Sequence, residues 1–399
     1  MLSRRVFLFI CSMENFEEKA CLCALNKIFG FEPRVGLSLI SHFGSAKEVF
    51  RLGEKKMERI IGPYSKYTGR INRQVLEETA DELHMLSRQN ISFHGITEST
   101  YPSLLRECED APIGLYIRST TPADELWRNH TVSIVGTRDI SLYGKEWCRK
   151  IVRGLSASTQ KPTIISGLAL GVDIEAHRSA IDSGLPTIAV MATGPESIYP
   201  HRHRNFAESL IDTPGCALVT DYPPGTAPLP IHFLRRNRII AGLSKATILI
   251  ESKIKGGGLM TSRLAFSYNR EVYALPGRAD DIRSQGCNEI IRNKIAEPVT
   301  SISSLIETMG MTSSLNNPKS SDTERLKLKY SGHIPEQDID LMTSIMKAVR
   351  NHRGLTAEDV SDTLQTGYLK TSELIGILEI DGFIIRDLFQ RCSINSKFL

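Results

Sequence analysis

The sequence lacks the features that identify several large classes of protein. No apolar run reaches roughly 20 residues, the length that crosses a membrane, so we expect no transmembrane helix. The eight cysteines include no CxxC pair and no cluster with histidine at zinc-binding spacing, which favours scattered reduced thiols in a cytoplasmic protein. Aromatic residues make up only 7% of the chain, so extended stacking against nucleic-acid bases is expected to be limited.

The chain also has almost no excess of charge of either sign. The chain has 49 basic and 45 acidic residues and a formal net charge of +4, so any surface for a polyanion must be local. Two familiar phosphate motifs are missing, because no GxGxxG follows a strand and no GxxxxGK[ST] occurs. Dinucleotide binding and ATP hydrolysis therefore have no direct support, and we expect neither a cofactor nor a metal ion.

The N-terminal part of the chain is predicted to be helical. Residues 1–12 are interpreted as a non-structural extension, because the apolar core VFLFIC is shorter than that of a signal peptide and no cleavage site follows. Residues 13–90 have apolar side chains such as Leu37 and Ile40 near helical spacing. They resemble a SAM or helix-hairpin-helix module, which can offer backbone N–H groups to DNA phosphate. A small packing or protein-binding domain is the alternative.

Residues 91–306 are predicted to form an α/β domain. Short apolar runs alternate with helical segments, and the runs are residues 132–135, 163–166, 187–191, 217–220, 246–250 and 271–275. Strands of this kind are covered on both faces, as in a parallel sheet with right-handed crossovers. We therefore expect an extended Rossmann-like, doubly wound and mostly parallel sheet, with residues 91–130 as its entry region.

The C-terminal part is predicted as a linker and a small separate domain. Residues 307–336 are rich in Ser, Thr, Asn, Gly, Pro and charge, which is typical of a linker. Residues 337–399 show the helix, helix, turn, helix, strand order of a winged helix. Its candidate recognition helix carries Lys370 but also Glu373 and Glu379, and carboxylates face phosphate badly. This favours a protein-contact or regulatory role, and reading of a DNA groove is the alternative.

The stretch 231–262 combines an arginine-rich helix, an apolar strand and a loop of three consecutive glycines. Glycine lets backbone N–H groups approach an anion, the next helix N-terminus adds a favourable dipole, and guanidinium groups add bidentate donors. Arg235 and Arg238 are expected to project together, with Arg236 on a neighbouring face. Three guanidiniums within four positions favour a bound anion, and a solvated arginine face is the alternative.

Ligands of doubly wound sheets lie beyond the carboxyl ends of the strands. We therefore expect residues from several strand ends to share one crevice and to bind phosphate, namely Gly136, Thr137, Arg138, Ser166, Gly167, Arg235, Arg236, Asn237, Arg238, Lys253, Lys255, Gly256, Gly257, Gly258 and Thr261. No matching set of carboxylates for acid–base chemistry accompanies them. The residues therefore predict a phosphate-binding protein rather than an enzyme.

Two catalytic alternatives stay open at this point. Ser166, His177 and Asp173 could form a catalytic set, although a His one turn from an Asp is more often a structural hydrogen bond. A nucleotide-binding enzyme or sensor that hydrolyses a glycosidic bond would need an acidic residue, and Glu251 at its strand end is the attractive candidate. A third reading is a scaffold that bridges partners and has no affinity for nucleic acid.

The motifs taken together carry a resemblance to a known family. In chain order they are VGTR (135–138), YG (143–144), SGLALGVD with AH (166–177), YP (199–200), DYPPGT (221–226), FLRRNRIIAGLS (233–244), ESKIKGGGLMTSRLA (251–265), LPG (275–277) and SQGCNEII (284–291). This succession closely resembles the DprA/Smf family of DNA-processing proteins over about residues 132–300. The flanking SAM-like and winged-helix modules fit the family's domain plan.

The resemblance implies a bacterial cytoplasmic protein that binds single-stranded DNA regardless of sequence. In the family, the protein protects incoming DNA during natural transformation, helps to load RecA recombinase and commonly forms homodimers. By motif, Arg138 matches the arginine of the family's glycine-serine-arginine turn, and Lys253 and Lys255 match basic positions before its glycine-serine loop. The segment 235–238 matches its arginine helix.

The chain departs from the family's pattern at several positions. Thr137 replaces the usual serine and keeps a hydroxyl, and Leu234 stands where the family often has proline. Gly256 and Gly258 replace serines, so two hydroxyl donors are lost while the backbone N–H groups remain. The two glycines remove side-chain hydroxyl contacts that the loop of the family would make. They do not change the expectation that a pocket is present.

Overall fold

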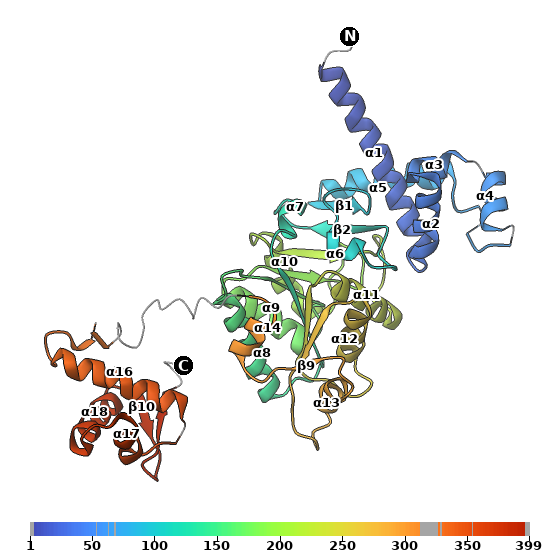
Figure 1. Ribbon diagram of the computed structural model, residues 1–399. Helices are drawn as coiled ribbons and strands as arrows, with labels where there is room; N and C mark the ends of the chain where they lie inside the picture. The colour runs from blue at the N-terminus through green and yellow to red at the C-terminus, as the bar shows by residue number, and fades with distance from the viewer. Residues whose placement is uncertain are drawn as a thin grey trace. The chain divides into compact units, whose positions relative to one another are not determined.

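The computed structural model describes residues 4–395 except 53, 63, 68, 312–325, 328 and 353, and it leaves the side chains of residues 4–16, 54 and 55 undescribed. The chain divides into two compact units, Met1–Ser314 and Leu315–Leu399 (Figure 1). Within the described residues, no helix combines the length and the hydropathy that a bilayer span requires.

Helices alone occur among the described residues before Ile91. They are α1 (Arg4–Phe29), α2 (Pro33–Phe43), α3 (Ala46–Arg51), α4 (Glu54–Ile61) and α5 (Arg73–Ser87). Gly44 ends α2 in the left-handed conformation, with φ of 84°, and its N–H donates to the Ile40 carbonyl. Residues 1–12 were predicted to be a non-structural extension, whereas helix α1 begins at Arg4. No Gly or Pro interrupts the sequence between Arg4 and Phe29 to end the helix.

A nine-stranded sheet forms the centre of the first unit, with the spatial order β1-β2-β6-β5-β4-β3-β7-β8-β9. Its strands are β1 (Ile91–Gly95), β2 (Gly114–Arg118), β3 (Thr131–Val135), β4 (Thr163–Ser166), β5 (Thr187–Val190), β6 (Ala217–Thr220), β7 (Ala246–Leu249), β8 (Glu271–Ala274) and β9 (Glu297–Pro298). The six predicted strands are all present, and β3 to β9 pair in parallel. Strands β1 and β2 were missed. They lie in the predicted entry region and extend the sheet in antiparallel fashion.

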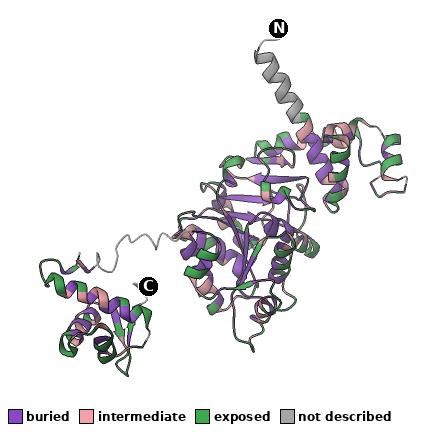
Figure 2. Ribbon diagram, in the orientation of Figure 1, coloured by how far each residue is buried: buried purple, intermediate pink, exposed green. Residues whose placement is uncertain are grey.

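Helices cover both faces of this sheet, as expected for buried parallel strands (Figures 1 and 2). They are α6 (Ser103–Arg106), α7 (Ala123–Leu126), α8 (Leu142–Ser156), α9 (Val172–Asp182), α10 (Arg204–Ile211), α11 (Pro230–Gly242), α12 (Gly257–Ser267), α13 (Gln285–Arg292) and α14 (Ile302–Thr308). Strand β3 shows the arrangement. Val132 and Ile134 join the core under α8, α9 and α14, whereas Val135 joins the core under α11, α12 and α13.

The order of the parallel strands reverses at β3, which lies between β4 and β7. The chain runs from β3 through β4 and β5 to β6 on one side, and then returns to place β7 on the other side of β3. Helices that follow β3 and β7 therefore leave on opposite faces, and a crevice opens beyond the carboxyl ends of these two strands. This topology fixes the position of the candidate site.

The second unit has its own hydrophobic core. Its elements are α16 (Glu336–Asn351), α17 (Ala357–Leu364), α18 (Tyr368–Ile380) and an antiparallel pair, β10 (Ile384–Arg386) and β11 (Cys392–Ile394). Thr356 and Asp359 form the capping box expected at the start of α17. Leu326 and Tyr330, which fall inside the stretch 307–336 predicted as a linker, are buried in this core, and residues 312–325 of that stretch lie outside the described residues.

Gly154 of α8 marks the place where α14 packs against α8. A Cβ atom at Gly154 would lie 2.2 Å from Cγ2 of Ile302, a stiff β-branched side chain. Gly154→Ala is expected to lower the free energy of unfolding by about 1–2 kcal/mol, since overpacking outweighs the gain in helix propensity. Tryptophan fluorescence during urea unfolding measures this, because Trp127 and Trp147 are the two tryptophans of the chain and both lie in the first unit.

The matched control is Gly376→Ala in α18. A Cβ atom there meets nothing within 4 Å, and the residue lies in the second unit. The control should leave the tryptophan transition in place. An unchanged transition for Gly154→Ala would contradict close packing of Ile302 against Gly154.

Candidate functional site

A pocket of about 640 Å³ lies in the crevice beyond β3 and β7. Its lining comes from the turn after β3, the loop after β7, the start of α12 and one face of α11. The lining residues are Val135, Gly136, Thr137, Arg138, Asp139, Asp173, Tyr199, Pro228, Pro230, Phe233, Leu234, Arg236, Asn237, Ile240, Ser252, Lys253, Lys255, Gly256, Gly257, Gly258 and Thr261. Eleven of the fifteen residues predicted from the sequence therefore share one pocket. Ser166, Gly167, Arg235 and Arg238 are absent from its lining.

The turn after β3 is held by backbone hydrogen bonds and presents Arg138. The N–H of Thr137 donates to the Glu251 carbonyl at 2.8 Å, and the N–H of Val172 donates to the Thr137 carbonyl at 3.1 Å. These bonds fasten the turn to the ends of β7 and α9. The Arg138 side chain is exposed, and its guanidinium lies 5.2 Å from the centre of the Phe233 ring. Arg138 is thus presented at the pocket by a rigid turn.

The loop after β7 leads directly into α12, whose N-cap is Gly256. The first N–H groups of a helix have no partner within it, and they give its N-terminus a positive potential. A Cβ atom at Gly258 would lie 2.7 Å from the Cα atom of Gly136, so the two loops pack backbone against backbone. Gly258 therefore has a steric reason to lack a side chain. Gly257 faces open space, where a Cβ atom would meet nothing within 4 Å.

Thr261 and Asn237 connect the start of α12 to its surroundings. Thr261 Oγ1 donates to the Gly257 carbonyl at 3.1 Å, and the amide of Asn237 donates to the same carbonyl at 3.4 Å. Both side chains are buried. They position the glycine loop in addition to lining the pocket.

Arg236 is the buried cation of the pocket wall. Its guanidinium donates to the backbone carbonyls of Gly167 and Val190, at the ends of β4 and β5. Its Nε atom has no hydrogen-bond partner, and the residue forms no ion pair within the described part of the chain. Burial lowers the pKa of Arg236, while Asp173 acts in the opposite direction. The positive charge is therefore held by carbonyl dipoles rather than by a carboxylate.

Ser166 and Gly167 do not line the pocket, so the prediction that they share the phosphate-binding crevice is not met. Ser166 is fully buried and its hydroxyl donates to the Ile134 carbonyl. A Cβ atom at Gly167 would lie 2.3 Å from the Arg236 guanidinium. The glycine therefore makes room for Arg236.

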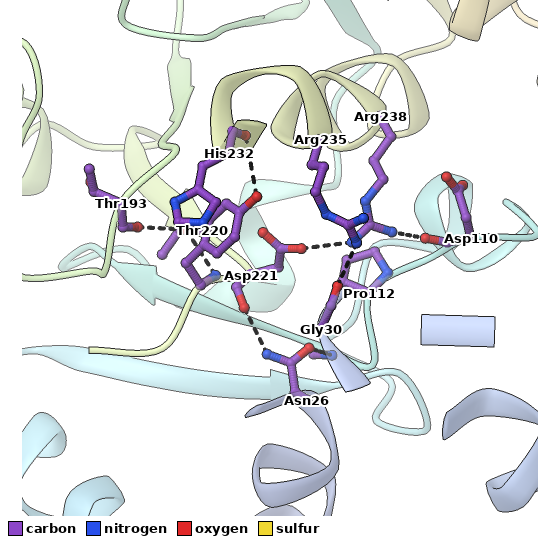
Figure 3. Close-up of polar contacts among 12 residues, drawn as sticks. Asn26, Gly30, Asp110, Pro112, Thr193, Thr220, Asp221, His232, Arg235 and Arg238 are labelled. Atoms are coloured by element: carbon purple, nitrogen blue, oxygen red, sulfur yellow. Dashed lines mark hydrogen bonds and ion pairs between the residues drawn. The ribbon is translucent and has the colours of Figure 1, made fainter. Parts of the chain in front are cut away.

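Arg235 and Arg238 project together, as expected (Figure 3), but neither lines the pocket. Arg238 pairs with Asp221 at 2.7 Å and donates to the Asp110 carbonyl. Arg235 donates to the Gly30 carbonyl at 2.8 Å and lies over the Phe31 ring, 4.5 Å from its centre. The prediction that the three arginines form one wall of a phosphate site is wrong. Arg238 is neutralised by a carboxylate distant in sequence, and Arg235 contacts the loop between α1 and α2.

Two aromatic side chains of the pocket were missed as site residues. Phe233 and Tyr199 line it, with ring centres 5.4 Å apart and an angle of 60° between the ring planes. Phe233 lies three positions before Arg236 and seven before Ile240, so helical spacing alone places it on the pocket face of α11. No sequence pattern pointed to Tyr199. The loop after β5, which contains it, is brought to the pocket only by the tertiary structure.

The carboxylates near the pocket form hydrogen bonds or ion pairs with other parts of the protein. Glu251 is buried, does not line the pocket, and accepts hydrogen bonds from the N–H and the hydroxyl of Ser141 at the start of α8. Asp173 lines the pocket, and burial raises its pKa despite the nearby Arg236. Asp139 pairs with Arg283 at 2.7 Å.

The residues considered as a catalytic set do not form a relay. His177 shares its Nδ1 hydrogen bond with the Thr187 hydroxyl at 2.7 Å, not with Asp173 or Ser166. Within the described residues, no group of three His, Cys, Asp or Glu side chains could hold a metal ion.

The remaining charge of the pocket is positive. Arg138, Lys253 and Lys255 are exposed, and among the described residues they form no ion pair. They surround the N-terminus of α12 and the buried Arg236. Unpaired cations around free N–H groups are suited to bind phosphate, and the aromatic wall offers a surface for a base.

Comparisons with known proteins give relatives of this chain in sequence and in structure. A sequence model of the family described as DNA recombination-mediator protein A matches residues 92–310. Protein Smf from Synechocystis sp. is 34% identical over 305 residues, which is 73% of each chain. DNA processing protein DprA from Streptococcus pneumoniae is 33% identical over 250 residues, or 61% of this chain and 86% of that one. The X-ray structure of the Streptococcus protein superposes with a TM-score of 0.59 at 30% identity, covering 71% of this chain and 95% of that chain.

Because Arg238 forms a buried ion pair with Asp221, its replacement should lower the stability of the fold. Replacement of an exposed arginine that only contacts DNA would not. Arg238→Met leaves the Asp221 carboxylate buried without its partner, so the free energy of unfolding should fall by about 3–5 kcal/mol. Adding Asp221→Asn should recover part of this loss, because no uncompensated charge remains. Urea unfolding followed by tryptophan fluorescence measures both. The control, Arg235→Met on the same helix face, should cost less than about 1 kcal/mol, and an equal loss for both arginines would contradict the assignment.

The buried His177 is expected to lower the free energy of unfolding at acidic pH. Burial lowers its pKa to about 3, with Arg236 and His203 adding to the effect. An ordinary pKa of about 6.5 in the unfolded chain means that the unfolded state takes up the proton first, so stability falls as the pH drops below that value. His177→Gln should reduce the slope of unfolding free energy against pH by about 1 kcal/mol per unit between pH 6 and 4. Urea unfolding at several pH values tests this, and an unchanged slope would refute it.

Proposed function

This chain belongs to the DNA recombination-mediator protein A family, and from that premise we propose that its pocket binds the phosphate backbone of single-stranded DNA without reading sequence. The observation that carries the proposal is the trio of exposed cations, Arg138, Lys253 and Lys255, which form no ion pair within the described residues and surround the N-terminus of α12. Contacts to phosphate are the same for every sequence. The affinity should therefore depend on salt and little on base composition.

The pocket walls favour a single strand over a duplex. Phe233 and Tyr199 form an aromatic wall beside the cations. An unpaired base can stack on such a ring, whereas the bases of a duplex are already stacked. The Arg138 guanidinium over the Phe233 ring keeps the cation and the stacking surface next to each other.

We propose binding rather than catalysis for this pocket. The glycosidic hydrolase alternative needs a carboxylate aimed at the ligand, and its candidate Glu251 is bound to Ser141 outside the pocket lining. Asp173 does line the pocket, but it is buried between the start of α9 and Arg236. These contacts support a binding role in which the carboxylates hold the fold.

The wider role is proposed from the family resemblance. It includes protection of incoming DNA in natural transformation, loading of RecA recombinase, a homodimer and a cytoplasmic location. We also propose that the N-terminal helices are a SAM-like module and that the second unit is a winged helix. The order α16, α17, α18 and the β10–β11 hairpin supports the latter. Lys370 pairs with Asp338 and Arg386 pairs with Glu379, which favours a protein contact over a DNA contact for this unit.

Removal of two pocket cations tests the proposal. Arg138→Ala with Lys253→Ala should weaken binding to oligo-dT and oligo-dC about equally. It should also reduce the slope of log affinity against log salt by about 1.4, since each phosphate contact on a single strand contributes roughly 0.7. Fluorescence anisotropy across a salt titration measures both quantities.

The matched control is Arg88→Ala with Lys347→Ala, which removes one exposed arginine and one exposed lysine outside the pocket. Its salt slope should equal that of the wild type. Wild-type affinity and slope in the pocket variant would disprove the site. Hydrolysis of nucleoside monophosphates by the wild type, lost in Asp173→Asn or Glu251→Gln, would favour the enzyme instead.

A further inference from the structure

A basic stripe runs along the exposed face of α8, outside the pocket. Lys145, Arg149 and Arg153 follow one another at intervals of four residues, about 6 Å apart along the helix. Arg178 approaches from α9. Two shallow depressions of about 450 and 290 Å³ lie along this face, and both are lined by Arg149 and Arg153, so they are continuous. We call this surface the α8–α9 groove.

Part of the positive charge in the groove has no partner. Arg149 pairs with Glu175 and Lys150 pairs with Glu146. Lys145, Arg153 and Arg178 form no ion pair within the described residues. Asp182 also lines the groove, so its lining contains five basic and three acidic side chains. The three unpaired cations are the ones that can engage an anion.

A serine side chain also lines the groove. Ser179 of α9 lines the smaller depression and is only 5% exposed. Its hydroxyl is not one of the buried side-chain oxygens that lack a partner, so the oxygen is open to the groove. A hydroxyl that is open to the groove is available to a ligand there, and phosphate oxygen is a suitable acceptor.

Two segments of chain lead from the pocket to the groove. Asp139 lines the pocket, and α8 begins three residues later at Leu142, which lines the groove. Asp173 in the first turn of α9 lines the pocket, and Glu175 in the same turn lines the groove. Helix α9 then runs about 13 Å from Asp173 to Asp182 at the far end of the groove.

From these observations we propose that a DNA single strand anchored in the pocket continues along the α8–α9 groove. Its phosphates contact Lys145, Arg153 and Arg178, and Ser179 donates a hydrogen bond to one of them. This inference rests on the proposed function of the pocket and adds the path of the strand beyond it. A strand is favoured over a free anion because Lys145 and Arg153 lie eight residues, about 12 Å, apart on α8, which is too far for one anion to contact both.

The test compares two lengths of oligo-dT on the full chain. A strand of about 6 nucleotides occupies the pocket alone, and one of about 30 nucleotides reaches the groove as well. Lys145→Ala, Arg153→Ala and Arg178→Ala together should reduce the salt slope for the long strand by about 2, from three contacts of roughly 0.7 each. They should weaken binding of the long strand about tenfold or more and leave the short strand unchanged.

Two further variants complete the design. Arg88→Ala, Arg292→Ala and Lys347→Ala together remove the same charge from exposed positions outside the groove and should behave as the wild type with both strands. Arg153→Ala alone should reduce the slope for the long strand by about 0.7, and it serves if the triple variant does not fold. The urea transition of tryptophan fluorescence establishes folding of the first unit in each case, and circular dichroism establishes folding of the second unit in the control with Lys347→Ala.

The outcomes separate the two proposals. If the wild type binds neither strand, the function proposed for the pocket fails and this inference fails with it. If the wild type binds both strands and the triple variant keeps the wild-type slope on the long strand, the pocket stands and the groove is not part of the path. If the triple variant loses calorimetric binding of inorganic phosphate but keeps its affinity for the long strand, the groove is an anion site and the strand proposal is wrong.

Discussion

The hydrogen bonds of the buried Arg236 guanidinium hold together the elements that form the pocket. A charge buried this deeply needs hydrogen-bond acceptors, and one terminal nitrogen of Arg236 donates to the carbonyls of Gly167 and Val190. Those carbonyls lie at the ends of two neighbouring parallel strands, so the arginine fixes α11 against the edge where ligands bind. The missing side chain at Gly167 leaves the space that this contact needs.

The two faces of helix α11 contact different parts of the protein. One face carries Phe233 and Asn237 into the pocket, where they meet the start of α12 and the turn that bears Arg138. The other face carries Arg238 to Asp221, whose backbone carbonyl in turn accepts a hydrogen bond from Asn26 of α1 (Figure 3). The same helix therefore shapes the site and fastens the N-terminal helices to the sheet. This explains why arginines adjacent in the sequence serve separate purposes.

Much of the fold was predictable because buried parallel strands leave a strong local signal. The six apolar runs became β3 to β8, and the loops that follow β3 and β7 met at one pocket because parallel strands end at the same edge. Strands β1 and β2 were not predicted, since they pair in antiparallel fashion with partners distant in the chain. The roles of Ser166 and Gly167 could not be read either, because both depend on contacts with residues more than thirty positions away.

The sequence by itself determined the fold class of the first unit, the edge of the sheet that carries the site, and the cations Arg138, Lys253 and Lys255, because each follows from local periodicity and chain order. Only the tertiary structure decided which charges remain free. Arg238 is neutralised by Asp221 and Arg236 by backbone carbonyls, and neither partner is adjacent in the sequence. An arginine's availability to a ligand depends on what is folded against it, and local spacing does not contain that information.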